Sequence, residues 1–192
     1  MGVTAPQVRH WTCEEYLRMA EAGIFAPGER VELIEGEIIA MTPQKGPHAT
    51  AVSLVYESLR SAFKAGFYVR QQLPLTLDPA SEPEPDVAVV RGNPRDYVQD
   101  HPPTALLVIE VADATLEFDR GRKAGLYARA GIPDYWIVNL PDRVLEVYRD
   151  PGPLADGPAE HGYRSIRRIG PPDSVAPLAS PAAHVRVADL LP

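Results

Sequence analysis

The segment LLVIEVADATLEFDRGRKAGLY, residues 106–127, begins with an apolar run that predicts a buried β-strand and continues into a helical pattern. Because side chains alternate along a strand, Leu106, Val108 and Glu110 are expected on one face and their neighbours on the other. Glutamate is rarely buried without a partner, since an ionised carboxylate in a low dielectric medium costs several kcal/mol. We therefore expect Glu110 either at the rim of the sheet, facing solvent, or beside a cation.

The helical part of this segment supplies a cation at a suitable spacing. If residues 117–130 form a helix, Asp119, Lys123 and Tyr127 lie on one side of it, one turn apart. The apolar residues on this side suggest that it packs on the sheet, where a lysine would be drawn toward Glu110. The alternative is a surface ion pair between Asp119 and Lys123, which stabilises a helix by only about 0.2–0.5 kcal/mol.

A second carboxylate stands at the entrance of another apolar strand. Asp86 follows Pro85 in the segment EPEPDVAVV. Two carboxylates at strand ends that meet in one sheet form an oxygen-rich site, which suits Mg²⁺ because this ion takes one or two carboxylates together with water and phosphate oxygens. Alternatively, Asp86 is a turn aspartate after a proline, which is a common role for this residue type.

The other elements predict one mixed domain with a C-terminal extension. A Thr-x-x-Glu capping box at Thr12 opens a helix to about residue 22, and a hairpin turns at Glu35 and Gly36. Further elements are an amphipathic helix within residues 46–66, a strand or strand pair at residues 67–77, and strands at residues 85–90, 135–139 and 144–150. This order favours an α/β (α+β) fold in which helices flank a mixed sheet.

The composition changes from residue 151 onward, where proline and alanine dominate segments such as PGPLADGP and GPPDSVAPLASPAA. We expect residues 1–150 to form the domain. Residues 151–192 are expected to form an extended, proline-rich arm packed on the same domain. Within this arm, YRSIRRI and VRVADLL are isolated candidates for a strand or a short helix.

Composition and charge restrict the class of protein. The chain has 192 residues, of which 45% are hydrophobic and 23% charged, the balance of a soluble globular domain. It has no apolar run of membrane-spanning length and no secretory signal pattern at its start, and its single cysteine excludes an internal disulfide, so a cytoplasmic location is expected. The net charge of −7 is unusual for a protein that binds nucleic acid tightly, because lysine and arginine must replace the counterions of phosphate. Any nucleic acid contact is therefore local, or the partner is something else.

Four segments, taken in order, resemble the PD-(D/E)XK nuclease superfamily, and within it the Uma-type family of restriction-endonuclease-like proteins. They are ELIEGEI (residues 32–38), PDVAVV (85–90), VIEV (108–111) and KAGLYARAGIPDYWIVN (123–139). The resemblance implies a restriction-endonuclease-like fold, with Asp86 and Glu110 as the acidic pair of the active site. The superfamily pattern has a lysine two residues after the acid, where this chain has Ala112. In the Uma-type family the lysine comes from the following helix, which matches Lys123.

The resemblance implies an Mg²⁺- or Mn²⁺-dependent endonuclease, with DNA as the expected substrate. Asp86, Glu110 and the Val111 carbonyl are expected to hold the metal, which polarises a phosphate oxygen and lowers the pKa of a bound water. Lys123 is expected to orient this water and to offset the charge that develops on the phosphorane. Supporting roles fall to Glu32, His48, Asp119 and Tyr127, with Thr115 as a candidate helix cap. For Glu32 and His48, a solvent-exposed position is the alternative.

Other features of the sequence leave more than one interpretation open. Trp11 and Trp136 are expected in the core or an interface and not as platforms for bases. The arginines at positions 120, 122 and 129 and the segment RSIRR, residues 164–168, could contact phosphate or form a solvated face. The sequence has no Gly-rich phosphate loop and no nucleophile elbow around a serine.

Two further functions compete with a DNA endonuclease. The first is a catalytically idle binding or assembly module that keeps the fold, which the acidic net charge favours. The second is a nuclease specific for RNA or for branched structures. Because a restriction-type nuclease cuts two strands, we also expect a homodimer, with the apolar YWIV segment and the proline-rich arm offering contact surface.

Overall fold

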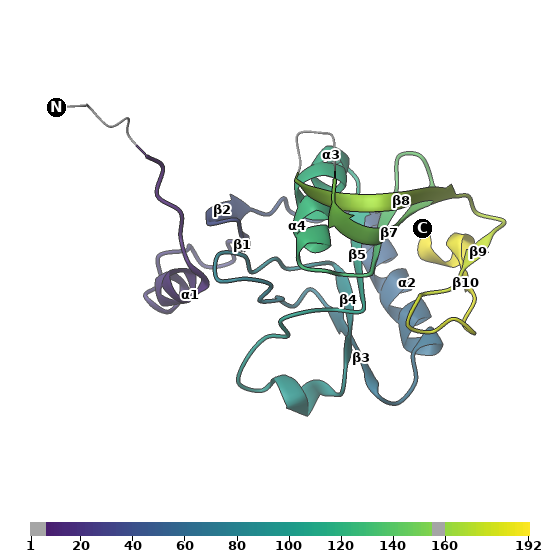
Figure 1. Ribbon diagram of the computed structural model, residues 1–192, viewed down its shortest axis with the longest axis horizontal. Coiled ribbons are helices and arrows are strands. Elements are labelled where there is room, and N and C mark those ends of the chain that lie inside the picture. Colours follow the sequence, from purple (N-terminus) through teal and green to yellow (C-terminus); the bar gives the residue numbers. More distant parts are fainter. Residues whose placement is uncertain (1–6, 155–159) are drawn as a thin grey trace.

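A six-stranded mixed sheet forms the centre of the protein, as the computed structural model in Figure 1 shows for residues 7–154 and 160–192. The strand order is β3-β4-β5-β6-β7-β8, and every neighbouring pair is antiparallel except the parallel pair β5 and β6. The strands are β3 (Phe67–Gln71), β4 (Val87–Arg91), β5 (Leu107–Ala112), β6 (Asp134–Asn139), β7 (Val144–Pro153) and β8 (His161–Ile169). The predicted fold class, a mixed sheet flanked by helices, is confirmed.

Helices and two small sheets surround this sheet. The helices are α1 (Cys13–Glu21), α2 (Gly46–Ala62), α3 (Leu116–Phe118) and α4 (Ala124–Arg129), with the 3-10 turns η1 (Pro94–Tyr97) and η3 (Val187–Leu190) and a π-helical turn η2 (Asp119–Lys123). The small sheets pair β1 (Val31–Ile34) with β2 (Glu37–Ala40), and β9 (Ser174–Val175) with β10 (Val185–Arg186). In the described part of the chain, no helix is both long and apolar enough to cross a membrane.

Local sequence rules explain the first helix and the hairpin. The Thr12 hydroxyl accepts a hydrogen bond from the Glu15 amide, and the Glu15 carboxylate accepts one from the Thr12 amide, so the predicted capping box is present. Between β1 and β2, Glu35 and Gly36 have φ values of +53° and +79°. A two-residue hairpin turn with positive φ at both positions matches the right-handed twist of its strands.

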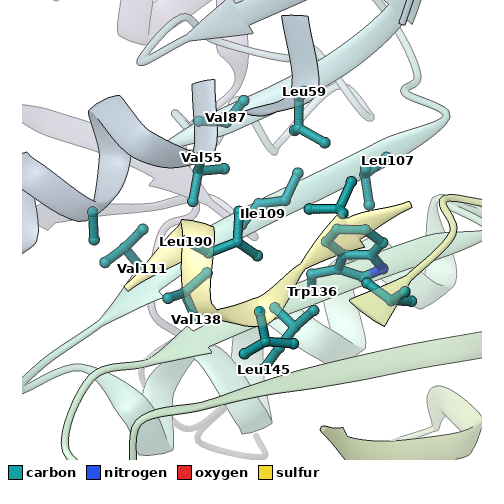
Figure 2. Packing of buried hydrophobic residues seen from close by; sticks show 14 of the residues in the cluster. Val55, Leu59, Val87, Leu107, Ile109, Val111, Trp136, Val138, Leu145 and Leu190 are labelled. Carbon is teal, nitrogen blue, oxygen red and sulfur yellow. The ribbon is translucent and has the colours of Figure 1, made fainter. Parts of the chain in front are cut away.

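The sheet buries an apolar layer on each face, as the alternation in β5 predicts. On one face, Leu107, Ile109 and Val111 pack against α2 and the C-terminal residues, as Figure 2 shows. On the other face, Val108 lies among side chains of α4 and four buried tyrosines at positions 127, 135, 148 and 163. Trp136 is 0% exposed and belongs to the first layer, as expected for a core residue.

The C-terminal residues join the sheet more closely than an appended arm would. The expected boundary at residue 150 falls inside β7, and the segment YRSIRRI lies in β8, which is one of the two edge strands of the sheet. Farther on, the buried carboxylate of Asp134 accepts hydrogen bonds from the Leu178 amide and from Arg149, which fastens this part of the chain to β6. Residues 155–159 of the expected arm lie outside the described residues.

Two predicted elements differ from those observed. The continuous helix expected over residues 117–130 is interrupted by the π-helical turn, in which the Ala124 amide donates to the Asp119 carbonyl. Thr115 makes no capping hydrogen bond with the backbone; its hydroxyl donates to Asp119 Oδ2 at 2.7 Å. The strand or strand pair expected over residues 67–77 ends at Gln71, because Gln72 has a φ of +51°, outside the range of strands.

The YWIV segment is the core of β6. Residues 135–138 are 0% exposed, so the prediction that this segment offers an intersubunit surface is wrong. An apolar run of this kind is typical of a strand that is covered on both faces of a sheet.

The arginines of the helical segment are paired with carboxylates, a pairing that the sequence did not predict. Arg120 forms two hydrogen bonds with Glu146 on β7, at 3.0 and 2.6 Å. Arg122 contacts Glu35, Glu37 and the Ile34 carbonyl, and Arg129 contacts Glu35 and Asp78. These contacts fix the hairpin and the helical segment to each other and leave these arginines less available to phosphate than expected.

Candidate active site

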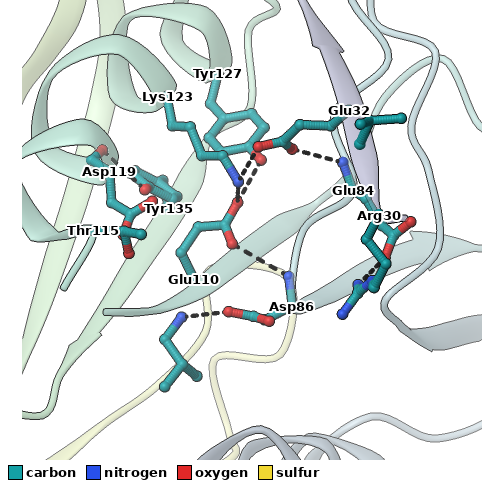
Figure 3. Close-up of polar contacts among 12 residues, drawn as sticks. Arg30, Glu32, Glu84, Asp86, Glu110, Thr115, Asp119, Lys123, Tyr127 and Tyr135 are labelled. Carbon is teal, nitrogen blue, oxygen red and sulfur yellow. Dashed lines mark hydrogen bonds and ion pairs between the residues drawn. The ribbon is translucent and has the colours of Figure 1, made fainter. Parts of the chain in front are cut away.

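The antiparallel pairing of β4 with β5 places Asp86 beside Glu110. Val87 pairs with Ile109, so the residue before β4 reaches the level of Glu110 (Figure 3). The Asp86 amide donates to Glu110 Oε2 at 3.3 Å, and the Val111 amide donates to Asp86 Oδ2 at 2.8 Å. Each carboxylate is therefore positioned by the backbone of the other strand, and they are only 7% and 4% exposed.

Lys123 and Tyr127 balance the buried carboxylate of Glu110. The Lys123 Nζ atom lies 3.0 Å from Glu110 Oε1, and the Tyr127 hydroxyl donates to the same oxygen at 2.7 Å (Figure 3). Lys123 is 5% exposed, so it forms no surface pair with Asp119 and instead faces the sheet. An apolar strand can hold Glu110 because the helical segment that follows it supplies both a cation and a hydroxyl donor.

Glu32 on β1 is a second partner of Lys123. Its Oε1 atom lies 3.2 Å from Lys123 Nζ, and its Oε2 atom accepts a hydrogen bond from the Glu84 amide at 3.1 Å. Glu32 is 3% exposed, which excludes the solvated position considered as the alternative. It contacts the lysine and the backbone before β4, and no hydrogen bond among the described residues joins it to Asp86.

Asp119 lies at the start of the π-helical turn and is buried next to the same cluster. Its carboxylate accepts the Thr115 hydroxyl, and the Tyr135 hydroxyl donates to its backbone carbonyl at 3.0 Å. Burial raises the pKa of Asp119 to about 6, although the charge of Lys123 opposes the shift. Asp119 therefore adds negative charge to the cluster without a direct contact to a cation among the described residues.

The pKa shifts of Glu110 and Lys123 reflect burial together with an excess of negative charge. Burial raises the pKa of Glu110 to about 8; Lys123 lowers it, and the charges of Asp86, Asp119 and Glu32 raise it. Burial would lower the pKa of Lys123, but the surrounding carboxylates raise it overall, so the ammonium stays charged. Several carboxylates thus share one buried ammonium, an arrangement that an additional cation would stabilise.

His48 approaches the site from the first turn of α2. Its Nε2 atom lies 3.4 Å from Asp86 Oδ2, and its side chain is 17% exposed, so the solvent-exposed alternative is wrong. The hydrogen bond to Asp86 raises its pKa, against the effect of burial, and the Val111 backbone and Asp113 add to the rise. Among residues 7–154 and 160–192, its Nδ1 atom is buried without a hydrogen-bond partner.

A cavity of about 260 Å³ opens beside these residues. Its acidic wall holds Glu32, Asp86, Glu110, Asp113 and Asp119, together with Lys123 and His48. Other parts of its lining are apolar and include Ile39, Met41, Pro43 and Phe118. This apolar wall could not be predicted from the sequence, because its residues come from β2, from the loop after it and from α3 and share no periodic pattern.

The donor atoms suit a small, hard cation. In the described part of the chain, no group of three or more histidine, cysteine or acidic side chains is placed to hold a metal. Mg²⁺ needs fewer, because it binds through one or two carboxylates and completes its shell with other oxygens. Asp86 and Glu110 could supply this pair. The Val111 carbonyl could add a further oxygen, since it points to the same side of β5 as the amide that donates to Asp86.

Comparison with known proteins agrees with this architecture. Residues 13–181 match Uma2, a family with the description "Putative restriction endonuclease". The chain belongs to the Uma2 family. Its fold is also similar to the crystal structure of a "putative nuclease belonging to DUF820" from Anabaena variabilis ATCC 29413, with 18% sequence identity, a TM-score of 0.69 and coverage of 93% of this chain and 96% of that chain. No curated protein matches the chain significantly.

The structure places a lysine beside Glu110 although the spacing departs from the superfamily pattern. The acid on β5 is followed two positions later by Ala112, and the nearest ammonium comes from η2, at the end of a π-helical turn. Such turns add a residue to a helix and are frequent at functional sites. The lysine that the resemblance assigned to the following helix is the one that lies beside Glu110.

Proposed function

We propose that this Uma2 protein is a metal-dependent endonuclease that hydrolyses phosphodiester bonds in DNA, with Asp86, Glu110 and Lys123 at its active site. One observation carries the proposal: two buried carboxylates lie at adjacent strands, Glu110 accepts a hydrogen bond from the Asp86 amide and Asp86 accepts one from the Val111 amide, and an ammonium lies 3.0 Å from Glu110. Clusters of ionisable groups with strongly shifted pKa values beside a cavity are typical of active sites. The family description supports the same class of activity.

The residues of the site divide the work of catalysis. Asp86, Glu110 and the Val111 carbonyl would hold Mg²⁺ or Mn²⁺, which when bound supplies Lewis-acid activation of a phosphate oxygen and of water. The Lys123 ammonium is fixed in a buried position, so it can stabilise negative charge on the phosphorane without reorganisation. Tyr127 and Glu32 position Glu110 and Lys123 through the hydrogen bond and ion pair described above.

The idle-module interpretation remains the second candidate, because one observation favours it. The arginines of the helical segment, expected as possible phosphate contacts, pair with carboxylates of the hairpin and of β7. The homodimer expected from duplex cleavage stays a prediction, and its contact surface does not include the buried YWIV segment.

Metal-dependent cleavage tests the proposal. With Mn²⁺, the protein is expected to cut DNA in a panel of plasmid, single-stranded and branched substrates, and EDTA should abolish cutting. Asp86→Asn should lower the rate by about 10³-fold or more, because loss of a metal ligand removes several kcal/mol of transition-state stabilisation. Asp150→Asn is the matched control, since Asp150 is 60% exposed and pairs only with Arg164 in the described residues. A folded protein that binds no Mn²⁺ and leaves every substrate intact would support the idle module.

A further inference from the structure

We propose that the cavity takes an unpaired nucleotide with its base against Phe118, so that the substrate is single-stranded DNA or an unpaired end. Phe118 ends α3, lines the cavity and directly precedes Asp119. This inference rests on the proposed nuclease function and names the substrate class of the same site.

The cavity wall combines polar groups that suit a phosphate with apolar side chains that suit a base. A phosphate and a hard cation need oxygen donors and positive charge, and Asp86, Glu110 and Lys123 provide these. These three residues do not explain the apolar part of the cavity lining. That part is formed by Ile39 and Met41, from β2 and the loop after it, and by Phe118 from α3. These side chains are only partly buried, so an apolar group of a ligand can cover them. Nucleic acid bases have flat faces that stack on aromatic rings whatever their sequence.

The carboxylates of the site lie deep in the cavity, which favours an unpaired strand over a duplex. Asp86 and Glu110 are 7% and 4% exposed, so a scissile phosphate must enter the cavity to reach them. The cavity, at about 260 Å³, is smaller than the roughly 300–1,000 Å³ of most ligand sites. In a duplex the bases are stacked and paired, and extruding one of them costs a few kcal/mol. An unpaired strand places a base and its phosphate in the cavity without this cost.

The charge of the protein and of its cavity also disfavours duplex DNA. Duplex DNA presents one charge about every 1.7 Å, and proteins that hold it contact many phosphates with lysine and arginine. Here the net charge is −7. At the cavity, Arg30 is paired with Glu84, Lys123 is buried, and Lys45, with a side chain 75% exposed, lies 4.0 Å from Asp113. Stacking on Phe118 would supply affinity that these few phosphate contacts do not.

Binding by fluorescence anisotropy tests this inference separately from cleavage. In Ca²⁺, the wild-type protein is expected to bind a labelled single-stranded oligonucleotide more tightly than the matched duplex. Phe118→Leu should weaken the single-strand affinity by about 5- to 150-fold, the range found when an aromatic stacking partner is removed. Phe118→Tyr keeps the ring and should bind like the wild type.

A phenylalanine away from the cavity gives the control. Phe25 packs against Tyr16 with ring centroids 5.6 Å apart and does not line the cavity, so Phe25→Leu should leave DNA affinity unchanged. Unchanged Mn²⁺ affinity and unfolding free energy in Phe118→Leu would show that the effect is local. If Phe118→Leu binds the single strand as tightly as the wild type, or if the duplex binds as tightly as the single strand, the inference is overturned.

Cleavage distinguishes this failure from failure of the proposed function. If duplex and single-stranded DNA are cut equally in an Asp86-dependent reaction, the nuclease proposal stands and the substrate inference is overturned. If no DNA is cut but binding of the single-stranded oligonucleotide depends on Phe118, the proposal that a base stacks on Phe118 is supported and the nuclease proposal fails.

Discussion

Replacing Lys123 with methionine is expected to lower the free energy of unfolding by about 3–5 kcal/mol at pH 8, the effect of removing one partner from a buried ion pair. Methionine keeps the apolar stem but leaves Glu110 and Glu32 without the cation they share at 3.0 and 3.2 Å. Both carboxylates are nearly inaccessible to water, so solvent cannot compensate for the loss. Urea unfolding of the two proteins measures the difference.

The penalty for this substitution should depend on pH. Burial raises the pKa of Glu110 from its usual 4.5 to about 8, so folding favours its neutral form, and its contribution to stability falls as the pH rises from 4.5 to 8. Lys123 opposes this shift, and its own raised pKa keeps it charged throughout this range. We therefore expect a smaller penalty at pH 5, where Glu110 is protonated in both proteins, and a larger one at pH 8.

An exposed lysine provides the control for this experiment. Lys64 follows α2 and is exposed, so Lys64→Met should change stability by no more than about 0.5 kcal/mol. A Lys123→Met protein as stable as the wild type at pH 8, or a penalty that does not change between pH 5 and pH 8, would show that Lys123 does not compensate the charge of Glu110.

Glu110→Gln is expected to lower the rate of DNA cleavage by about 10³-fold or more while the protein stays folded. Glutamine has the same shape, and its amide oxygen can still accept hydrogen bonds from Tyr127 and Lys123, which hold Oε1 in the native protein, although its NH2 group cannot accept the hydrogen bond that the Asp86 amide donates to Oε2. It carries no negative charge, so it is a poor ligand for a hard divalent cation. Single-turnover cleavage with Mn²⁺ measures the effect, and circular dichroism checks the fold.

Glu117→Gln is the matched control, because Glu117 has the same charge and lies in α3 but its side chain is 89% exposed. It should cut DNA at the wild-type rate. If folded Glu110→Gln also cuts at that rate, Glu110 is not a ligand of the catalytic metal, and the acidic pair must be assigned elsewhere.

Local signals in the sequence predicted the elements that local interactions determine. The capping box at Thr12 and the hairpin at Glu35 and Gly36 depend on residues only a few positions apart. The contact between Glu110 and Lys123 was also predictable, because the strand and the helical segment that carry them are adjacent in the chain and each has a clear periodicity. The metal site and the catalytic roles drawn from these residues stay predictions.

Features that depend on distant residues were not predictable in the same way. The π-helical turn leaves no mark on the hydrophobic pattern, and the place of β8 at the edge of the sheet depends on pairing with β7. The partners of Arg122 lie in the hairpin, more than 80 residues earlier in the chain, at separations of 85–88 positions. The same reason explains why Phe118 gave no signal, since its neighbours in the cavity wall come from β2 and the loop after it.

The position of the cation tests the account most directly. Anomalous diffraction from crystals soaked in Mn²⁺ should show a peak within about 2.5 Å of carboxylate oxygens of both Asp86 and Glu110, with the Val111 carbonyl as a further ligand. A peak that contacts neither carboxylate, or none at saturating Mn²⁺, would contradict the assignment of these residues to one metal-dependent active site.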